Sequence, residues 1–210
     1  MNTKKQKMDK NYSLIKDIRS SKLYKESVQK REPRARKKIE TDFKINNSKN
    51  ILPGQLIYFD YFEPKTKEDL EYYDARPVTL FFSIVQTEEG KRILGFNIHY
   101  FPPRIRYQIL NKILEIYNKQ YSRYWDSKPR TQLTGFNYKK LLKEITNAGL
   151  EFGVRMYIPS LIRNIRYIPV SGWSTAVYTE GIFKKKTREM ILQYWKNHST
   201  QNITKTKKIK

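Results

Sequence analysis

Positive charge gathers at the two ends of this chain, and that distribution limits which part can build a hydrophobic core. The 210 residues carry a formal net charge of +23. Residues 1–50 contribute +10 and residues 196–210 contribute +5, whereas the much longer stretch 51–195 contributes only +8. We therefore predict a basic N-terminal arm over 1–50, a core domain over 51–195 and a basic C-terminal tail over 196–210. By composition, we expect the two arms to be disordered in isolation.

Composition excludes several classes of protein. The chain has no cysteine, which rules out a disulfide scaffold, a thiolate metal site and a cysteine nucleophile. No apolar run approaches the roughly 20 residues that span a bilayer, and no apolar segment follows the basic N-terminus, so we expect neither a transmembrane helix nor a secretory signal. The apolar fraction is 38% while aromatic residues reach 14%, which indicates a modest core rich in rings.

The first half of the core domain has the pattern of a small sheet. Residues 55–62, 78–86 and 92–99 are rich in aromatic and β-branched types and predict three strands. Residues 87–91 (TEEGK) predict the hairpin turn between the second and third strands. Gly95, inside the third strand, predicts a bulge or sharp bend of the kind that small barrels need.

Helices are predicted mainly in the second half. Pro103 suits the first position of a helix over 104–118, and amphipathic helices are expected over 137–147 and 184–197. Shorter strands are candidates at 152–158, 165–170 and 175–179, with a helical turn at 159–164. The expected fold class is therefore α+β: a small antiparallel sheet or SH3-like β-barrel with added helices and extended basic terminal arms.

Nothing in the sequence clearly supports catalysis, and we expect a protein that is not an enzyme and needs no cofactor or metal. The two histidines, His99 and His198, have no neighbour at metal-ligand spacing, and no glycine-rich phosphate loop is present. Asp74 followed by 89–91 (EGK) resembles a metal-dependent nuclease pattern, in which two carboxylates hold Mg²⁺. The same triplet is ordinary for a hairpin turn, and we favour that interpretation.

Binding of a polyanion has more support. The densest basic patch is 30–38 (KREPRARKK), where Pro33 disfavours a continuous helix and an extended strand along a phosphate backbone is the alternative. Further cations flank the helix that begins near Pro103 and open the last helix. No base-reading signature appears, so we expect contacts to the DNA backbone. The candidate DNA-binding residues are Arg34, Arg36, Lys37, Lys38, Arg104, Arg106, Lys184, Lys185, Lys186 and Arg188. There are two simpler alternatives. The basic tails are only solvated, and tyrosines such as Tyr58, Tyr61 and Tyr100 belong to the core of the sheet instead of stacking on bases.

The middle of the chain resembles the DNA end protector proteins of T-even-like tailed bacteriophages. The resemblance follows Pro53-Gly54, Tyr58-Phe59 and Tyr61, then 64–67 (PKTK), 72–74 (YYD) and Arg76-Pro77, and is most specific in 95–103 (GFNIHYFPP) followed by Arg104 and Arg106. It spans roughly residues 51–195. Glu71 departs from the family pattern, in which proline is expected, and the long C-terminal region of the family looks shortened.

The resemblance implies a virion protein, also present in the host cytoplasm during assembly and after injection. Such a protein would bind double-stranded DNA ends without sequence preference, shield them from host exonuclease and complete the head together with other head and neck subunits. No membrane and no small-molecule substrate is implied. His99, Tyr100 and Asp74 are expected to hold the junction between strand and helix. The first alternative is a ring subunit of the neck, the portal-adjacent region or the tail, without end protection. The metal-dependent nuclease is the less favoured alternative.

Overall fold

A computed structural model describes residues 14–45, 51–62, 74–124, 137–183 and 189–193 of the chain. The strands are β1 (Leu56–Tyr61), β2 (Val78–Thr87), β3 (Gly90–Asn97), β4 (Val154–Tyr157) and β5 (Ile162–Ile168). The α-helices are α1 (Leu14–Ser20), α2 (Val28–Asp42), α3 (Pro103–Tyr124), α4 (Tyr138–Asn147) and α5 (Trp173–Ala176). Short 3-10 turns are η1 (Lys22–Lys25), η2 (Ile98–Tyr100), η3 (Glu151–Gly153), η4 (Pro159–Leu161) and η5 (Val170–Gly172). No described helix is both long and apolar enough to cross a membrane.

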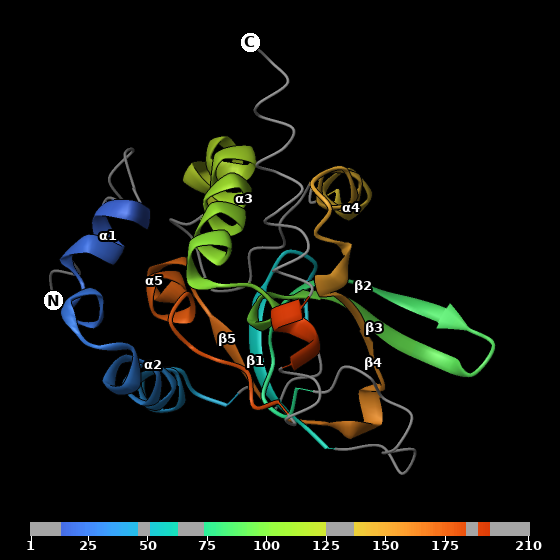
Figure 1. Cartoon of the computed structure of the whole chain (residues 1–210). Helices are drawn as coiled ribbons and strands as arrows, with labels where there is room; N and C mark the ends of the chain where they lie inside the picture. The colour runs from blue at the N-terminus through green and yellow to red at the C-terminus, as the bar shows by residue number, and fades with distance from the viewer. Residues whose placement is uncertain (1–13, 46–50, 63–73, 125–136, 184–188, 194–210) are drawn as a thin grey trace, which may run out of the picture.

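The strands form one antiparallel sheet in the order β4-β3-β2-β1-β5, which confirms the α+β class (Figure 1). The two edge strands, β4 and β5, follow each other in the chain, with only residues 158–161 between them. This short connection draws the two edges toward each other and curls the sheet. Within the described residues no ladder joins β4 to β5, so the sheet is open, the first of the two expected architectures.

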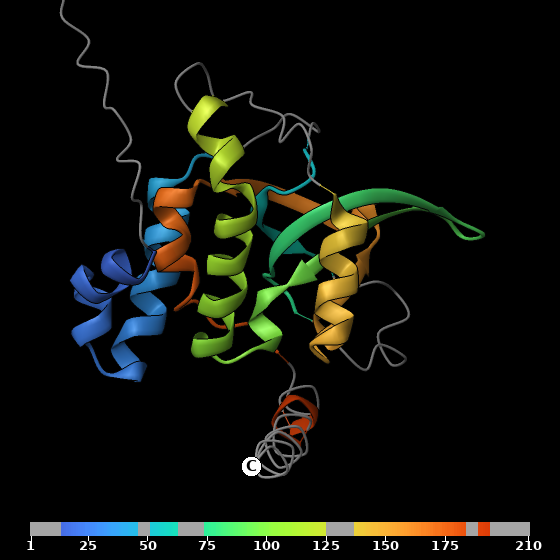
Figure 2. The same cartoon turned by 90° about the horizontal axis from the view of Figure 1, so that it is seen from above.

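The hairpin of β2 and β3 carries the predicted turn and the predicted bulge. Gly90, with φ of 109°, closes the turn in a conformation that favours glycine. The register shifts between Phe81 and Ser83, opposite Gly95 and Leu94, so the extra residue lies in β2 facing Gly95. A Cβ on Gly95 would lie 2.4 Å from a methyl carbon of Thr79, which explains the glycine. Beyond the bulge the hairpin projects from the body of the molecule (Figure 2).

Two clusters of buried side chains lie on opposite faces of the sheet. In the smaller one every buried member belongs to a strand, including Phe59, Tyr61 and Tyr157, whose rings pack edge to face. Since a flat sheet cannot bury its own face, this cluster fills the inside of the curl. In the larger cluster the other face packs against helices, among them α3, α4 and α5, which cover it in Figure 2. The interpretation of Tyr58, Tyr61 and Tyr100 as core residues is confirmed, because all three are buried.

Residues 14–43 differ from the extended arm that their charge predicts. They form α1, η1 and α2, and they bury Leu14, Ile18, Leu23, Ala35 and Ile39 in the same cluster as the sheet. Residues 46–50, where we expected the boundary, lie outside the described residues, so the boundary itself stays a prediction. The described part of the N-terminal segment nevertheless lies against the body of the molecule, where its helices flank α5 (Figure 2).

Two local predictions were wrong. Pro33 lies inside α2 and the helix continues through it, although proline deprives the carbonyl of Gln29 of its intrahelical donor at a cost of ~3 kcal/mol. Pro33 is exposed, so water can reach the backbone there, and the burial of Ala35 and Ile39 offsets the cost. Residues 175–179 are not a strand: α5 begins at Trp173, whose indole donates to the carbonyl of Ile168 and anchors the turn.

The remaining predictions of elements hold in kind, with shifts at their ends: α3 continues to Tyr124, six residues beyond the expected end, and β5 begins at Ile162, inside the expected helical turn. Helix α3 begins at Pro103 and α4 runs over Tyr138–Asn147 with Leu141 and Ile145 buried, both as expected. Gly149, with φ of 67°, follows α4 in the left-handed conformation that ends many helices. Most of the expected last helix lies outside the described residues; its described part, residues 189–193, is helical.

Candidate nucleic-acid interface

One face of α2 carries a stripe of exposed cations. Lys30, Arg34, Lys37 and Lys38 are all exposed, and their spacing of three to four residues places them on one side of the helix. Ala35 and Ile39, on the opposite side, have no exposed surface. The basic segment therefore presents its charges from a rigid helix anchored by its apolar face, instead of from an extended strand. Three of the predicted residues, Arg34, Lys37 and Lys38, belong to this stripe. Lys30, which lies in the predicted basic patch but was not among the candidate DNA-binding residues, is the fourth.

The start of the stripe is braced by a carboxylate and a second arginine. The side chain of Arg34, 66% exposed, donates to Glu26, whose side chain is 17% exposed. Arg31 donates to the backbone oxygens of Tyr24 and Glu26, and its guanidinium lies 4.7 Å from the ring centre of Tyr178. These contacts fix the connection between η1 and α2 and with it the position of Arg34.

Arg36 has a different role from its neighbours. It is half-buried, pairs with Glu32 one turn earlier, and donates to the carbonyl oxygen of Glu180 at 2.9 Å. This contact ties α2 to the segment that follows α5. As placed, the guanidinium serves the contact between the N-terminal and C-terminal segments, and its DNA contact remains only a prediction.

Arg104 and Arg106, two residues apart, lie in contrasting surroundings. Arg104 is exposed at the start of α3, whereas Arg106 is 4% exposed. Arg106 donates from Nε to the carbonyl of Phe101 at 2.6 Å, from Nη2 to that of His99 at 3.2 Å, and from Nη1 to those of Val177 and Thr179. Burial lowers the pKa of Arg106 to about 10, which still leaves it charged at neutral pH. Its placement argues against the predicted phosphate contact and for a role in holding the chain around α3.

The other predicted cations lie outside the described residues, so their role stays a prediction. They are Lys184, Lys185, Lys186 and Arg188.

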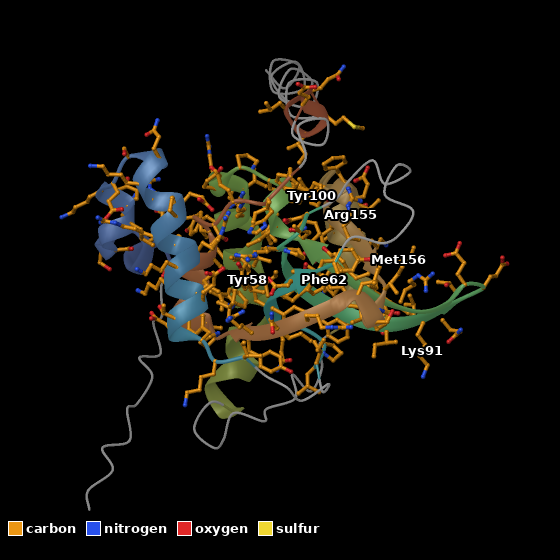
Figure 3. All side chains as sticks on the ribbon, turned by 90° about the horizontal axis from the view of Figure 1, so that it is seen from below. Tyr58, Phe62, Lys91, Tyr100, Arg155 and Met156 are labelled. Carbon is orange, nitrogen blue, oxygen red and sulfur yellow. The ribbon has the colours of Figure 1, made fainter. Side chains whose placement is uncertain are left out.

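Further exposed lysines occupy the outer face of α4, as its amphipathic pattern indicates: Lys139, Lys140 and Lys143. A guanidinium at Arg155 stacks 4.5 Å from the ring centre of Tyr100, so this arginine packs on the core. Figure 3 shows Arg155 close to Tyr100, whereas Lys91 lies far out on the hairpin.

Asp74 is the centre of a buried polar network at the junction between β3 and α3. One carboxylate oxygen accepts from the backbone N–H groups of Arg76 and Ile182, and the other accepts from the amide of Asn97 and from Nδ1 of His99 at 2.7 Å. Nε2 of His99 faces the hydroxyl of Thr179 at 3.0 Å. The network joins β3 to the chain that follows α5, which confirms the prediction that His99 and Asp74 hold this junction.

The two titratable groups of the network shift in the directions that favour a carboxylate beside a neutral imidazole. Burial alone would raise the pKa of Asp74, but the adjacent His99 and the donated hydrogen bonds hold it below its ordinary value. Burial lowers the pKa of His99, and this outweighs the attraction of Asp74. His99 is therefore neutral at pH 7 and donates from Nδ1 to the carboxylate.

The residues of the nuclease-like pattern are not brought together. Asp74 precedes β2 and is saturated with donors, whereas Glu89 lies in the turn beyond the far end of β2 and pairs with Arg92 at the surface. The ten residues of β2 separate them by about 30 Å. Across the described ranges, no group of three His, Asp or Glu residues is placed to hold a metal ion. The hairpin-turn interpretation of 89–91 is confirmed.

A curled antiparallel sheet covered by helices, with a cationic helix face and a saturated polar junction, defines a basic α+β protein. Comparison with known families is more specific. The family model of the phage T4 terminal DNA protecting protein matches residues 1–198, and the chain belongs to this family. The match includes the N-terminal segment that the resemblance over 51–195 left out. No match was found among curated proteins or among solved structures.

Proposed function

We propose that this bacteriophage protein binds the ends of double-stranded DNA without sequence preference and shields them from host exonuclease. The observation that carries the proposal is the family match over residues 1–198, because the family is described by protection of terminal DNA. The proposal also includes completion of the head, residence in the virion, and a purely non-catalytic action in the host cytoplasm. DNA ends and neighbouring head or neck subunits are its partners.

The mechanism is steric occlusion supported by neutralisation of phosphates. Each cation of the α2 stripe that contacts a phosphate releases counterions, which supplies binding energy without reading the sequence of the DNA. Because α2 is anchored through Ala35 and Ile39, a duplex bound along the stripe lies against a rigid surface. An exonuclease that must take hold of the terminal base pairs then meets protein instead.

A ring subunit of the neck or tail is the second candidate, and the β2–β3 hairpin favours it. Near the tip of the hairpin Glu88 and Glu89 balance Lys91 and Arg92, so the tip is neutral in a strongly basic protein. Ile84, on the same hairpin, is 57% exposed. A neutral projection with an exposed isoleucine suits a protein neighbour better than DNA. In our proposal this hairpin contacts the next virion subunit.

Exonuclease protection tests the proposed function directly. Linear and circular DNA of one sequence are incubated with the purified protein, and binding is measured across a salt titration. We expect linear DNA to survive exonuclease at one or two protein molecules per end, and we expect binding to prefer the linear form. Equal binding to both forms with a steep salt dependence and no protection would leave a generic basic surface and favour the ring subunit.

A further inference from the structure

A polar pocket of about 400 Å³ lies beside the cationic stripe, where two distant parts of the chain meet. The N-terminal segment contributes its residues from the end of α1 to α2, and the segment of η5 and α5 contributes the rest. The pocket is lined by Ser20, Ser21, Leu23, Glu26, Arg34, Lys38, Ser171, Ser174 and Thr175. Five of these residues carry hydroxyl groups and two carry positive charge, a combination suited to an oxyanion.

Its floor is rigid. Leu23, Ser174 and Thr175 are each less than 10% exposed, and they belong to elements that pack on the larger core cluster. Ser21 accepts a hydrogen bond from the N–H of Leu23, so its own hydroxyl proton can still be donated. The two cations, Arg34 and Lys38, lie one turn apart on α2 at the exposed side of the pocket.

Glu26 is the one acidic residue lining the pocket, and its placement explains how it can be tolerated beside an anion. Its Oε1 accepts from Nη1 of Arg34, and its Oε2 is buried without a hydrogen-bond partner among the described residues. The carboxylate thus holds one side of the guanidinium and leaves the remaining N–H groups of Arg34 to a ligand. With Arg34 and Lys38 against Glu26, the pocket carries a net positive charge.

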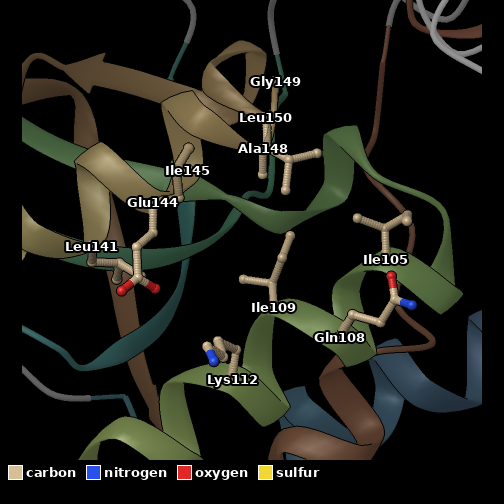
Figure 4. A pocket seen from close by; sticks show the side chains of 10 residues that line it. All are labelled: Ile105, Gln108, Ile109, Lys112, Leu141, Glu144, Ile145, Ala148, Gly149 and Leu150. Atoms are coloured by element: carbon tan, nitrogen blue, oxygen red, sulfur yellow. The ribbon is translucent and has the colours of Figure 1, made fainter. Parts of the chain in front are cut away.

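Another hollow of similar size has the opposite chemistry. The groove between α3 and α4, about 440 Å³, is walled by Ile105, Ile109, Leu141, Ile145 and Leu150, with Lys112 and Glu144 also lining it (Figure 4). An oxyanion there would lose its hydration with few donors in return. A phosphate group is therefore suited to the pocket beside α2 and not to the groove.

We propose that the pocket beside α2 binds the 5′-terminal phosphate monoester of a DNA end, while the cationic stripe contacts neighbouring phosphates of the same strand. The inference rests on the proposed function and deepens it by naming the group that distinguishes an end from the interior of a duplex. A terminal monoester carries close to two negative charges and three acceptor oxygens, whereas an internal phosphodiester carries one charge and two such oxygens. Several hydroxyl donors and two cations match the monoester.

Shape leads to the same choice. Internal phosphates lie along the surface of a duplex, where a flat or convex cationic helix face can reach them. A group that enters a pocket must project from the strand, and only the terminal phosphate of a strand does so without bending the duplex. Because the pocket adjoins Arg34 and Lys38, a strand whose end lies in the pocket can continue along Lys37 and Lys30.

Two duplexes that differ only in the 5′ group test the proposal. Fluorescence anisotropy at constant salt compares a 5′-phosphorylated duplex with the same duplex bearing 5′-hydroxyl ends, both with 3′-hydroxyls. We expect the phosphorylated duplex to bind about five- to thirtyfold more tightly, the ratio that about 1 to 2 kcal/mol of additional binding free energy provides. Ser171→Ala, at an exposed position that is safe for folding, is expected to reduce this ratio.

Lys38→Gln and Lys37→Gln form the matched pair of variants. Both remove one exposed positive charge from α2, but only Lys38 lines the pocket. Lys38→Gln is expected to bring the ratio between the two duplexes close to one. Lys37→Gln is expected to weaken binding to both duplexes by the same factor and leave their ratio intact.

The outcomes separate this proposal from the proposed function. If the wild-type protein protects both duplexes from exonuclease and binds them equally, the pocket assignment is overturned while end protection stands. If the protein shows no preference for linear over circular DNA, the proposed function itself fails. Inorganic phosphate is the third probe: a rise in melting temperature that Lys38→Gln abolishes, together with equal binding of the two duplexes, would assign the pocket to free phosphate and overturn the DNA-end proposal.

Discussion

The junction around Asp74 and the pocket beside α2 both gather charged and hydroxyl side chains, yet they use them in opposite ways. Around Asp74 every named polar group has a partner inside the protein, and Arg106 donates only to backbone carbonyls. Beside α2, Arg34 and Lys38 face solvent and serine and threonine residues line an open hollow. In this basic protein, therefore, the partners of a cation and its exposure decide whether it serves folding or binding; the charge alone does not.

The largest effect in this comparison is expected when each of the two arginines at the start of α3 is replaced in turn by methionine. Arg106→Met should reduce the free energy of unfolding by about 3 to 5 kcal/mol, because it leaves buried carbonyl groups without a donor. Arg104→Met, at the exposed position two residues earlier, should change it by less than about 0.5 kcal/mol. Urea unfolding measures both. An equally small effect of the two substitutions would remove the distinction between the folding cations and the binding cations.

A smaller loss should follow from truncating the apolar side of α2. Ile39→Ala removes a side chain with no exposed surface and should cost about 2 to 4 kcal/mol. If residues 14–43 were instead a loose arm, the substitution would leave the unfolding midpoint unchanged. The exposed Thr41→Ala, on the same helix, is the control and should be nearly neutral. This measurement also tests whether the N-terminal segment unfolds together with the sheet.

Acidification should weaken the junction around Asp74. The pKa of His99 is lowered in the folded protein, so the unfolded chain takes up the proton first, and stability should fall as the pH drops below the ordinary histidine value of about 6.5. Asp74, whose pKa is also lowered, adds a second loss as the pH falls below about 4. Melting temperatures between pH 8 and pH 3 give the profile. His99→Gln should lack the first of the two steps; a variant that retains it would place its origin elsewhere.

Local patterns predicted the strands, the hairpin and the helix starts because each depends on neighbouring residues. The alternation of aromatic and β-branched residues placed β1, β2 and β3, and Pro103 placed the start of α3. The helix through Pro33 could not be predicted locally, since its stability comes from packing of Ala35 and Ile39 on distant elements. The helical conformation of α5 could not be predicted locally either, because the indole of Trp173 donates to the carbonyl of Ile168 in a turn that residue propensities do not reveal.

The candidate site also has some features that the sequence predicts locally and others that depend on distant parts of the chain. Arg34, Lys37 and Lys38 are visible as a basic run, and their common exposure follows from the period of a helix. The hydrogen-bond partners of Arg106 could not be predicted locally, because they include residues 177 and 179, far along the chain. The pocket is equally hidden, since its serines are ordinary loop residues until η5 and α5 meet α2. Arg106 stands three, four and seven residues before Ile109, Leu110 and Ile113, so the helix period places it on the apolar face, and this spacing is the sequence signal that could have suggested its burial.

The place of β1 in the sheet has a consequence for how the protein is made. Leu56 pairs with Leu80 on one side and with Ile168 on the other, so the second ladder needs residues that leave the ribosome only after most of the chain. Pairing across such a long separation is slow, and until it occurs β1 has an unprotected edge. The walls of the pocket, from residues 20–38 and 171–175, come together only at that late stage. A prematurely ended chain lacks α5, against which α2 packs, so it can neither anchor the cationic helix nor assemble the pocket. Only completed molecules can present both features.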